Sequence, residues 1–175
     1  MRTDNGPGMP PTRPASITAA ALLTAVNDAV PRLSSVSTAR SAQSPAPGKW
    51  SPREIIGHLI DSVQNNHGRF VRAQLSHDLV FPGYAQDDWV RLQGYGERDW
   101  GELIALWAAY NRHLVHVIER VSPDAADRPR REHNLDQIAF HSVSPGTPTT
   151  LAYFMADYVT HLEHHLRQVW EATDA

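Results

Sequence analysis

Apolar residues recur at three- and four-residue spacing in four separate segments of the chain, which is the pattern of amphipathic helices. The segments begin near residues 16, 51, 99 and 149. A strictly alternating pattern, which would indicate strands, is not evident in the sequence. Four helical segments without a strand signal predict an all-α fold, a four-helix bundle of the up-down type with long connections.

Prolines mark where long helices are permitted. None of the 13 prolines lies in 53–81, 83–122 or 149–175. Because a proline inside a helix costs about 3 kcal/mol, these three windows are where long helices fit best. In the first segment, Pro31 is expected to disturb or end the helix.

Residues with capping chemistry stand at the expected helix starts. Ser51 suits the N-cap, Pro52 suits the first helical position, and Glu54 follows Ser51 by three residues, so the second helix should open with a capping box. The second helix should run to about residue 76. For the first helix, either Ser16 or Thr18 is suited to the N-cap. Further capping residues are expected to open the other two helices: Asp99, and Thr149 or Thr150.

The remaining segments are rich in proline, glycine and polar residues and are expected to connect or flank the helices. Residues 1–15 are interpreted as a flexible N-terminal tail that precedes one domain, 16–175. A long connection is expected at 77–98 and a second at 122–148, with a short helix or an extended piece at 135–140. Connections of that length more often carry function than serve as simple links.

Composition narrows the class of protein. A 41% share of hydrophobic residues and a 20% share of charged residues predict a packed globule. The net charge of −3 and the lack of a basic stripe argue against a nucleic-acid-binding surface. No apolar run approaches the roughly 20 residues of a membrane span, and residues 1–15 contain no apolar secretion signal. We therefore expect a cytoplasmic protein without a membrane or nucleic-acid partner.

The chain contains no cysteine. A disulfide framework, a thiolate metal site and a cysteine nucleophile are therefore all excluded. Any metal must be held by histidines and carboxylates, and any thiol chemistry requires a thiol supplied by a second molecule.

Two histidines interrupt the apolar stripe of the last helix. His161 and His165 are four residues apart, so their side chains project from the same helix face. Burying two imidazoles is unfavourable unless they are hydrogen-bonded or bound to a metal, so the pair is either a satisfied core pair or a pair of metal ligands. The spacing favours a metal, and His58 on another helix supplies a third ligand. Three imidazoles with an open position suit zinc, nickel, iron or copper.

Other polar residues lie close to these histidines in sequence. Asp61 is three residues after His58; it is our candidate catalytic base for a metal-bound water, and the alternatives are that it orients an imidazole or lies in solvent. Gln168, three residues after His165, could hydrogen-bond a ligand or a neighbouring helix. His164 points about 100° away from His165 and is expected at the rim of the site.

The other histidines have no partner at an informative spacing, although His133 or His141, on a flexible connection, could approach the site. Phe81, Tyr84 and Trp89 in the first long connection either wall a substrate pocket or anchor the connection on the core. The sequence does not decide between these two interpretations.

Three separated motifs resemble the DinB/YfiT-like superfamily. They are the segment Gly48–Asp61, which resembles "gkWS..E...HL.D", the stretch Phe81–Trp89, which resembles "P.Y..D.W", and the helix Tyr158–Gln168, which resembles "yv.H..hH..Q". The resemblance spans about residues 16–172. It implies a four-helix bundle, often dimeric, that holds a divalent metal, zinc and nickel among them, through three histidines. Carried onto this chain, these are His58, His161 and His165.

The resemblance implies several activities. Members of the superfamily include thiol S-transferases that use bacillithiol or mycothiol, a mycothiol-dependent isomerase and metal-dependent hydrolases. Our first hypothesis is a metal-dependent transfer of a low-molecular-weight thiol cosubstrate to a small electrophile. The second is metal-assisted hydrolysis with Asp61 or a loop residue as base. The third is a non-catalytic metal-binding stress protein. A homodimer is expected from the resemblance alone.

Overall fold

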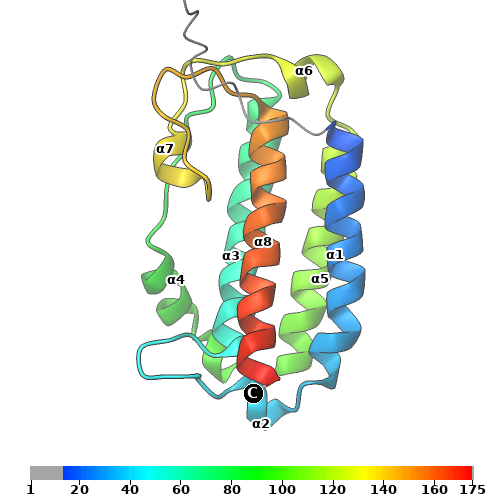
Figure 1. The fold of residues 1–175 in the computed structure, drawn as a ribbon, viewed down its shortest axis with the longest axis vertical. Coiled ribbons are helices and arrows are strands. Elements are labelled where there is room, and N and C mark those ends of the chain that lie inside the picture. Colours follow the sequence, from blue (N-terminus) through cyan, green and yellow to red (C-terminus); the bar gives the residue numbers. More distant parts are fainter. Residues whose placement is uncertain (1–13, 175) are drawn as a thin grey trace, which may run out of the picture.

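The structure, a computed structural model, describes residues 14–174 and is a bundle of four long helices (Figure 1). The long helices are α1 (Ala15–Ser35), α3 (Pro52–Ala73), α5 (Trp100–Glu119) and α8 (Leu151–Thr173). Short helices occupy the connections: α2 (Thr38–Ser41), α4 (Gln86–Gln93), η1 (Tyr95–Glu97), α6 (Pro123–Asp127) and α7 (Leu135–Ile138). The described residues contain isolated β-bridges but no strand. The predicted all-α four-helix bundle is therefore confirmed.

The predicted N-terminal tail falls almost entirely on residues 1–13, which lie outside the described residues. Ala15, the last residue assigned to that tail, is already the first residue of α1.

The long helices pack around a square in which α1 and α3 each contact both α5 and α8. Arg53, near the start of α3, donates hydrogen bonds to the carbonyls of Gly96 and Arg98, just before α5 begins. Farther along, His67 lies beside Tyr110. α3 and α5 therefore run in the same direction, because residues 74–99 carry the chain back along the outside of the bundle (Figure 1). The long connections are confirmed, but strict alternation of helix direction does not hold for this pair.

Helix starts follow the predicted caps in three of the four long helices. In α3, the Glu54 carboxylate accepts the Ser51 N–H at 2.7 Å and the Ser51 hydroxyl accepts the Glu54 N–H at 3.4 Å, which forms the capping box. Asp99 caps α5 by accepting an N–H at 2.9 Å, and Thr150 caps α8 in the same way at 3.0 Å. These bonds satisfy donors that the first helical turn leaves without partners.

The first helix departs from the prediction at both ends. Neither Ser16 nor Thr18 caps it, because α1 begins one residue earlier and the carbonyl of Pro14 accepts the first N–H groups. Pro31 does not end it either, since the helix continues to Ser35. Leu33, in that last turn, is fully buried, and its carbonyl accepts the indole N–H of Trp100 at 3.1 Å. This packing holds the helix together beyond the proline.

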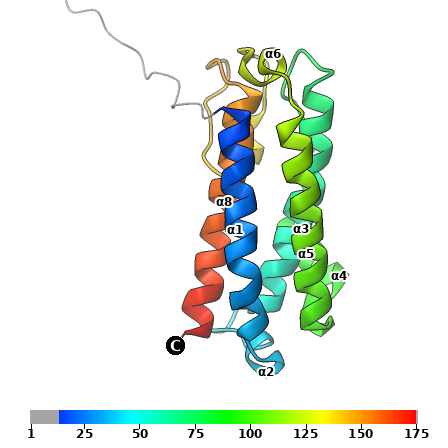
Figure 2. The ribbon, with the colours of Figure 1, turned by 90° about the vertical axis from the view of Figure 1, so that its right-hand side faces the viewer.

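The connection between α3 and α5 is more ordered than its sequence indicated. It contains α4 and η1, whereas the sequence predicted a long connection at 77–98 and no helix within it. α4 has only eight residues, of which Val90 alone is buried, so its apolar pattern is too short to reveal a helix. Seen from the side, the long helices stand together, with α6 covering one end and α4 lying outside the bundle near the other (Figure 2).

Candidate metal centre

The structure brings His58, His161 and His165 together where α3 and α8 face each other. Each offers a ring nitrogen, and these three atoms lie within 4.8 Å of one another. The Nε2 atoms of His58 and His161 are 3.2 Å apart. A tetrahedral metal with Zn–N bonds of about 2.0–2.1 Å places its ligand nitrogens about 3.3 Å apart. The arrangement therefore fits a single divalent metal ion.

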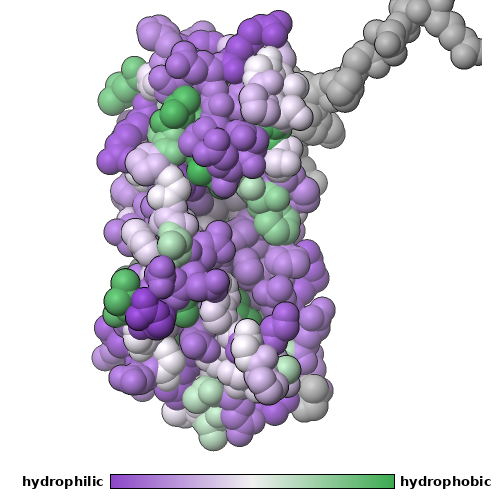
Figure 3. Space-filling view, turned by 90° about the vertical axis from the view of Figure 1, so that its left-hand side faces the viewer, coloured by the Kyte–Doolittle hydropathy of each residue, from purple (hydrophilic) through white to green (hydrophobic). Residues whose placement is uncertain are grey.

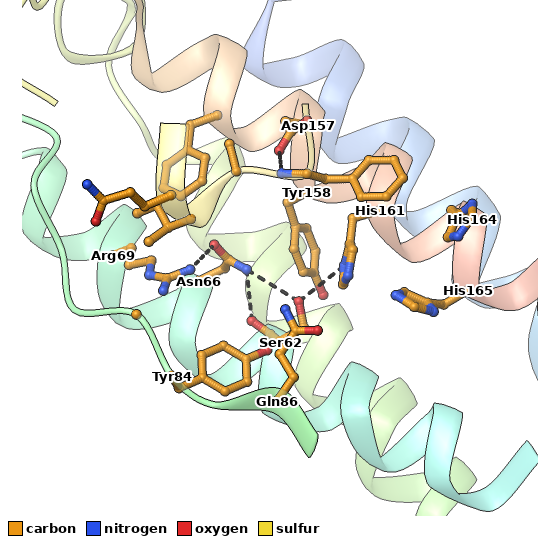
Figure 4. Close-up of a pocket in the computed structure, with 16 residues that line it drawn as sticks. Ser62, Asn66, Arg69, Tyr84, Gln86, Asp157, Tyr158, His161, His164 and His165 are labelled. Carbon is orange, nitrogen blue, oxygen red and sulfur yellow. Dashed lines mark hydrogen bonds between the residues drawn. The ribbon is translucent and has the colours of Figure 1, made fainter. Parts of the chain in front are cut away.

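Hydrogen bonds orient two of the three rings. His165 Nδ1 lies 2.8 Å from Gln168 Oε1, and since an amide oxygen only accepts, that nitrogen carries the proton. The lone pair of His165 is then on Nε2. His161 Nδ1 lies 3.4 Å from the Ser62 hydroxyl, which again leaves Nε2 toward the cluster. Figure 4 shows the rings of His161 and His165 beside each other, with Ser62 below. The tautomer that Gln168 fixes at His165 is typical of metal-ligating histidines.

Burial keeps the three imidazoles neutral. It lowers the pKa of His58 to about 3, with a smaller contribution from the charge of His165. Burial and the three neighbouring histidines lower the pKa of His161 to about 2. The pKa of His165 is also lowered by burial, while its bond to Gln168 opposes the shift. Neutral imidazole is the form that ligates metals, so the site is ready for an ion at neutral pH.

Asp61, three residues after His58 on α3, is fully buried. Its Oδ1 accepts hydrogen bonds from the Tyr95 hydroxyl at 2.7 Å and the Gln93 amide at 2.6 Å. Burial raises the pKa of this carboxyl, and the two hydrogen bonds oppose that change. The interpretation that Asp61 lies in solvent is therefore wrong.

Gly57 makes room for Tyr95 to reach Asp61. A Cβ atom at position 57 would lie 2.1 Å from Cγ of Tyr95, far inside any real contact distance. The tyrosine ring therefore packs directly on the α3 backbone next to His58. A glycine at this position of the helix lowers helix propensity, and the close approach of the ring is its structural reason.

A first cavity of about 350 Å³ opens beside the cluster (Figure 4). His161, His164 and His165 line one end of it. α3 contributes Ser62, Asn66 and Arg69, and the segment before α4 contributes Tyr84. The face of the molecule that carries α4 and α7 is mostly hydrophilic, with small separate hydrophobic patches (Figure 3).

A second cavity of about 590 Å³ also borders the cluster, and His165 and Gln168 line it together with Trp50. The ring centre of Trp50 is 5.0 Å from that of His58. Phe140, in the first cavity, lies 5.5 Å from His161 in the same measure. Two aromatic side chains therefore contact the histidine cluster, which borders two cavities.

Comparison with known proteins identifies the family of this chain. The model of the DinB superfamily matches residues 21–169. The chain belongs to the DinB superfamily. A search among curated proteins found no match. Among solved structures, the chain is similar to YfiT from Bacillus subtilis, described as "a probable metal-dependent hydrolase with an unusual four-helix bundle topology". The TM-score is 0.74 at 16% identity, over 99% of this chain and 92% of that one, which shows a shared fold.

The structure also locates the other predicted residues of this DinB-superfamily chain. Tyr84 lines the first cavity, whereas Phe81 is buried and stacks on Phe154, so the two interpretations of the aromatic connection apply to different residues. His133 bonds the Thr147 carbonyl, and His141 bonds Asp157; neither lines the first cavity. No helix in the described part of the chain is long and apolar enough to cross a bilayer.

Sequence reasoning missed a row of polar residues on α3. Ser62, Asn66 and Arg69 follow His58 by four, eight and eleven positions, which places all of them on one helix face. All three are buried and line the first cavity. A polar row at helical spacing, continuing from a candidate ligand, was the signal that could have found them.

Asp157 was missed as well, although it stands four residues before His161 on the same face of α8. Its two carboxylate oxygens accept the backbone N–H groups of Phe140 at 2.7 Å and His141 at 2.8 Å. Asp157 thus holds the segment that carries Phe140 against the histidines. Only the fold reveals this contact, since it joins α8 to a connection of irregular backbone.

Proposed function

We propose that this protein is a metal-dependent enzyme in which His58, His161 and His165 hold one divalent ion, zinc or nickel, and that it transfers a low-molecular-weight thiol to a small electrophile. One observation carries the proposal. The three neutral imidazoles form one cluster, and two cavities border it: His161 and His165 line the first, and His165 also lines the second. A reaction that joins two small molecules requires a pocket for each, next to the same reactive centre.

The donor set fits a catalytic metal better than a structural one. Three protein ligands leave a position open, whereas structural zinc sites have four protein ligands. Among the described residues, only these three histidines form a cluster of three or more potential ligands. When bound, such a metal would act as a Lewis acid that lowers the pKa of a thiol or a water molecule.

The surrounding residues bind the two molecules and shield them from water. Trp50 covers the histidines on the side of the second cavity, which takes the thiol. Tyr84 and Phe140 line the first cavity, which takes the electrophile. In the transfer, the thiol loses its proton to solvent and a new C–S bond forms. The bond to the leaving group breaks, and that group departs with the electron pair. Because the chain has no cysteine, the sulfur comes from the cosubstrate.

Asp61 acts on His58 rather than on substrate. It lines neither cavity, which favours a role toward His58 over one as a base toward a bound molecule. Among the described residues, His58 Nδ1 and Asp61 Oδ2 are both buried without a hydrogen-bond partner, so no hydrogen bond joins them in this structure and each has capacity for one. The two side chains are three residues apart on α3. His58 Nδ1 is a donor when Nε2 of the same ring ligates a metal, and Asp61 Oδ2 is an acceptor. Asp61 is therefore a positioning residue.

Metal-assisted hydrolysis is the second candidate. The polar lining of the first cavity, with His164 at its rim, provides for a water molecule and a proton acceptor close to the histidines. The description of YfiT as a probable metal-dependent hydrolase supports it by analogy of fold.

One assay panel separates the two candidates. Untagged protein loaded with zinc or nickel is given cysteine, glutathione, coenzyme A, mycothiol or bacillithiol with a chloronitroarene, and separately a set of esters and amides. Metal-dependent loss of free thiol supports transfer, and metal-dependent hydrolysis without thiol consumption supports the second candidate. A His161→Ala variant should lose either activity, whereas His77→Ala, at an exposed position, should retain it. Inactivity in the whole panel would contradict the proposal.

The expected homodimer is a further proposal from the resemblance to the superfamily. Analytical ultracentrifugation tests it directly, with a mass near twice 19.5 kDa as the expected result.

A further inference from the structure

Arg69 places a buried positive charge in the wall of the first cavity. Its side chain is only 4% exposed and lines the cavity together with Asn66 and Tyr84. Its Nη2 donates to the Pro82 carbonyl at 2.7 Å, and its Nη1 donates to Asn66 Oδ1 at 3.4 Å. A guanidinium has five N–H donors, so these two bonds leave donors available to a bound molecule.

No carboxylate among the described residues lies within ion-pair distance of Arg69. The one acidic residue that lines the same cavity is Asp157, and both its oxygens accept N–H groups from the segment that carries Phe140. Burial lowers the pKa of Arg69, with Tyr84 the only group that opposes the change. A buried guanidinium without a counter-charge is costly to maintain.

A second buried arginine, Arg130, has a structural role and serves as a comparison for Arg69. Arg130 is 2% exposed and donates to the carbonyls of Ala73, Ala125 and Arg128, which tie α3 to the second long connection. It lines neither of the two cavities beside the histidines. Arg69 differs on both counts, since it has fewer backbone partners and borders the empty space next to the histidines. A fold-stabilising role alone therefore does not account for it.

Helix geometry sets the separation between Arg69 and the histidines. Arg69 follows His58 by eleven positions, three turns farther along the same face of α3. At 1.5 Å per residue, that offset is about 16 Å along the helix axis, measured between backbone positions. The long side chain of Arg69 and the cavity between them leave space for a small molecule that touches both.

We propose that Arg69 binds a carboxylate group on the substrate and that the reacting group of the same molecule lies at the histidines. A carboxylate has two oxygens in one plane, which match the forked donors of a guanidinium. The charge that the cavity lacks would then arrive with the substrate. The inference rests on the proposed function for its reacting end, and it names the class of substrate: a small carboxylic acid with an electrophilic centre at the far end.

Calorimetric titration of the metal-loaded protein tests the carboxylate site. Glutarate is compared with glutaramide, which has the same shape without charge. We expect glutarate to bind at least tenfold more tightly in the wild type, and within twofold of glutaramide in Arg69→Gln. Arg72→Gln, at an exposed position one turn away on α3, should behave as the wild type. Equal affinities in the wild type would overturn the inference, as would a preference that survives in Arg69→Gln, since that preference would come from the metal.

Arg69→Lys keeps the positive charge but loses the paired N–H donors of the guanidinium. This variant replaces Arg69→Gln in the test if Arg69→Gln does not fold. We expect glutarate to bind at least threefold more weakly to Arg69→Lys than to the wild type; unchanged affinity would contradict the proposed contact. A parallel assay with 4-chloro-3-nitrobenzoate and its uncharged amide as electrophiles separates the two proposals. If neither electrophile is turned over but glutarate still binds more tightly than glutaramide, thiol transfer is rejected and the carboxylate site at Arg69 is retained. Turnover at equal KM for both would reject the site and retain thiol transfer.

Discussion

Gln168 lies one turn beyond His165 on α8, and its Oε1 accepts a hydrogen bond from His165 Nδ1 at 2.8 Å. The amide nitrogen of the same side chain donates to His164 Nε2 at 3.1 Å. A single glutamine thus fixes the tautomer of one ring and the position of its neighbour. This contact leaves His165 Nε2 free to join the other two imidazoles, which makes Gln168 part of the candidate metal centre.

Replacing Gln168 with leucine should weaken metal binding without unfolding the bundle. Loss of an outer hydrogen bond to a ligand typically lowers metal affinity about 10–100-fold, and we expect Gln168→Leu in that range. Competition with a chromophoric zinc chelator measures it. Glu163→Leu, an exposed position on the same helix, is the control and should bind as the wild type. Identical affinities for the wild type and Gln168→Leu would show that the contact does not support a ligand.

Replacing Asp61 with asparagine tests whether Asp61 orients His58. The variant keeps the size of the side chain but removes the negative charge that would pair with His58 Nδ1–H. We expect about tenfold weaker metal binding, with a larger effect than Tyr95→Phe, which removes one of the two hydrogen bonds to Oδ1 and the bond to Gln93 but keeps the carboxylate charge. If Asp61→Asn abolished turnover while leaving metal affinity intact, Asp61 would be a catalytic base after all.

Gly57 should not tolerate even a methyl group. The Cβ atom of Gly57→Ala would lie 2.1 Å from Cγ of Tyr95, so the tyrosine must move and its hydroxyl must leave Asp61. Overpacking of this kind costs about 1–3 kcal/mol in the free energy of unfolding. Gly68→Ala is the matched control on the same helix, because its Cβ would meet only the end of Arg72, at 3.5 Å.

Helix propensity predicts that the Gly68→Ala control gains about 1 kcal/mol. Urea denaturation of the two variants measures both effects. Equal stability of Gly57→Ala and the wild type would contradict the close packing of Tyr95 on α3.

The metal-free protein should lose stability in acid through its buried histidines. Burial lowers the pKa of His58 to about 3 in the folded state, against about 6.5 when unfolded. The unfolded chain therefore binds the proton first, so the stabilising effect of neutral His58 is complete above pH 6.5 and is lost as the pH falls toward 3. Each such histidine contributes a slope of up to about 1.4 kcal/mol per pH unit in that window.

Urea denaturation of the metal-free protein between pH 8 and pH 4.5 measures that slope. His58→Gln removes one titrating group and should flatten the curve, while His77→Gln, at an exposed position, should leave it unchanged. A curve of equal slope in wild type and His58→Gln would mean that His58 is not held neutral by the fold.

Much of the bundle could be predicted because its helices are specified by residues close together in the sequence. The caps at Ser51, Asp99 and Thr150 and the spacing of apolar residues define three helix starts, and His161 and His165 share a face by helix geometry alone. The parallel course of α3 and α5 could not be predicted, because a connection as long as 74–99 can return to either end of the bundle.

The contacts that surround the histidines depend on that connection and were missed for the same reason. Tyr95, which holds Asp61, belongs to η1, and Pro82, which accepts a bond from Arg69, stands in the irregular stretch before α4. Their partners are 34 and 13 residues away in sequence. No pattern within a helix encodes a pairing of that kind.

Elemental analysis of untagged protein tests whether His58, His161 and His165 hold one metal ion. We expect about one divalent ion per chain in the wild type and in His164→Ala, whose imidazole lies beside the cluster but is not a ligand. His161→Ala and His58→Ala should each lose the ion while keeping the helical circular dichroism spectrum. Absence of bound metal from the wild type, even after zinc or nickel is added back, would contradict the assignment of a metal site to these three histidines.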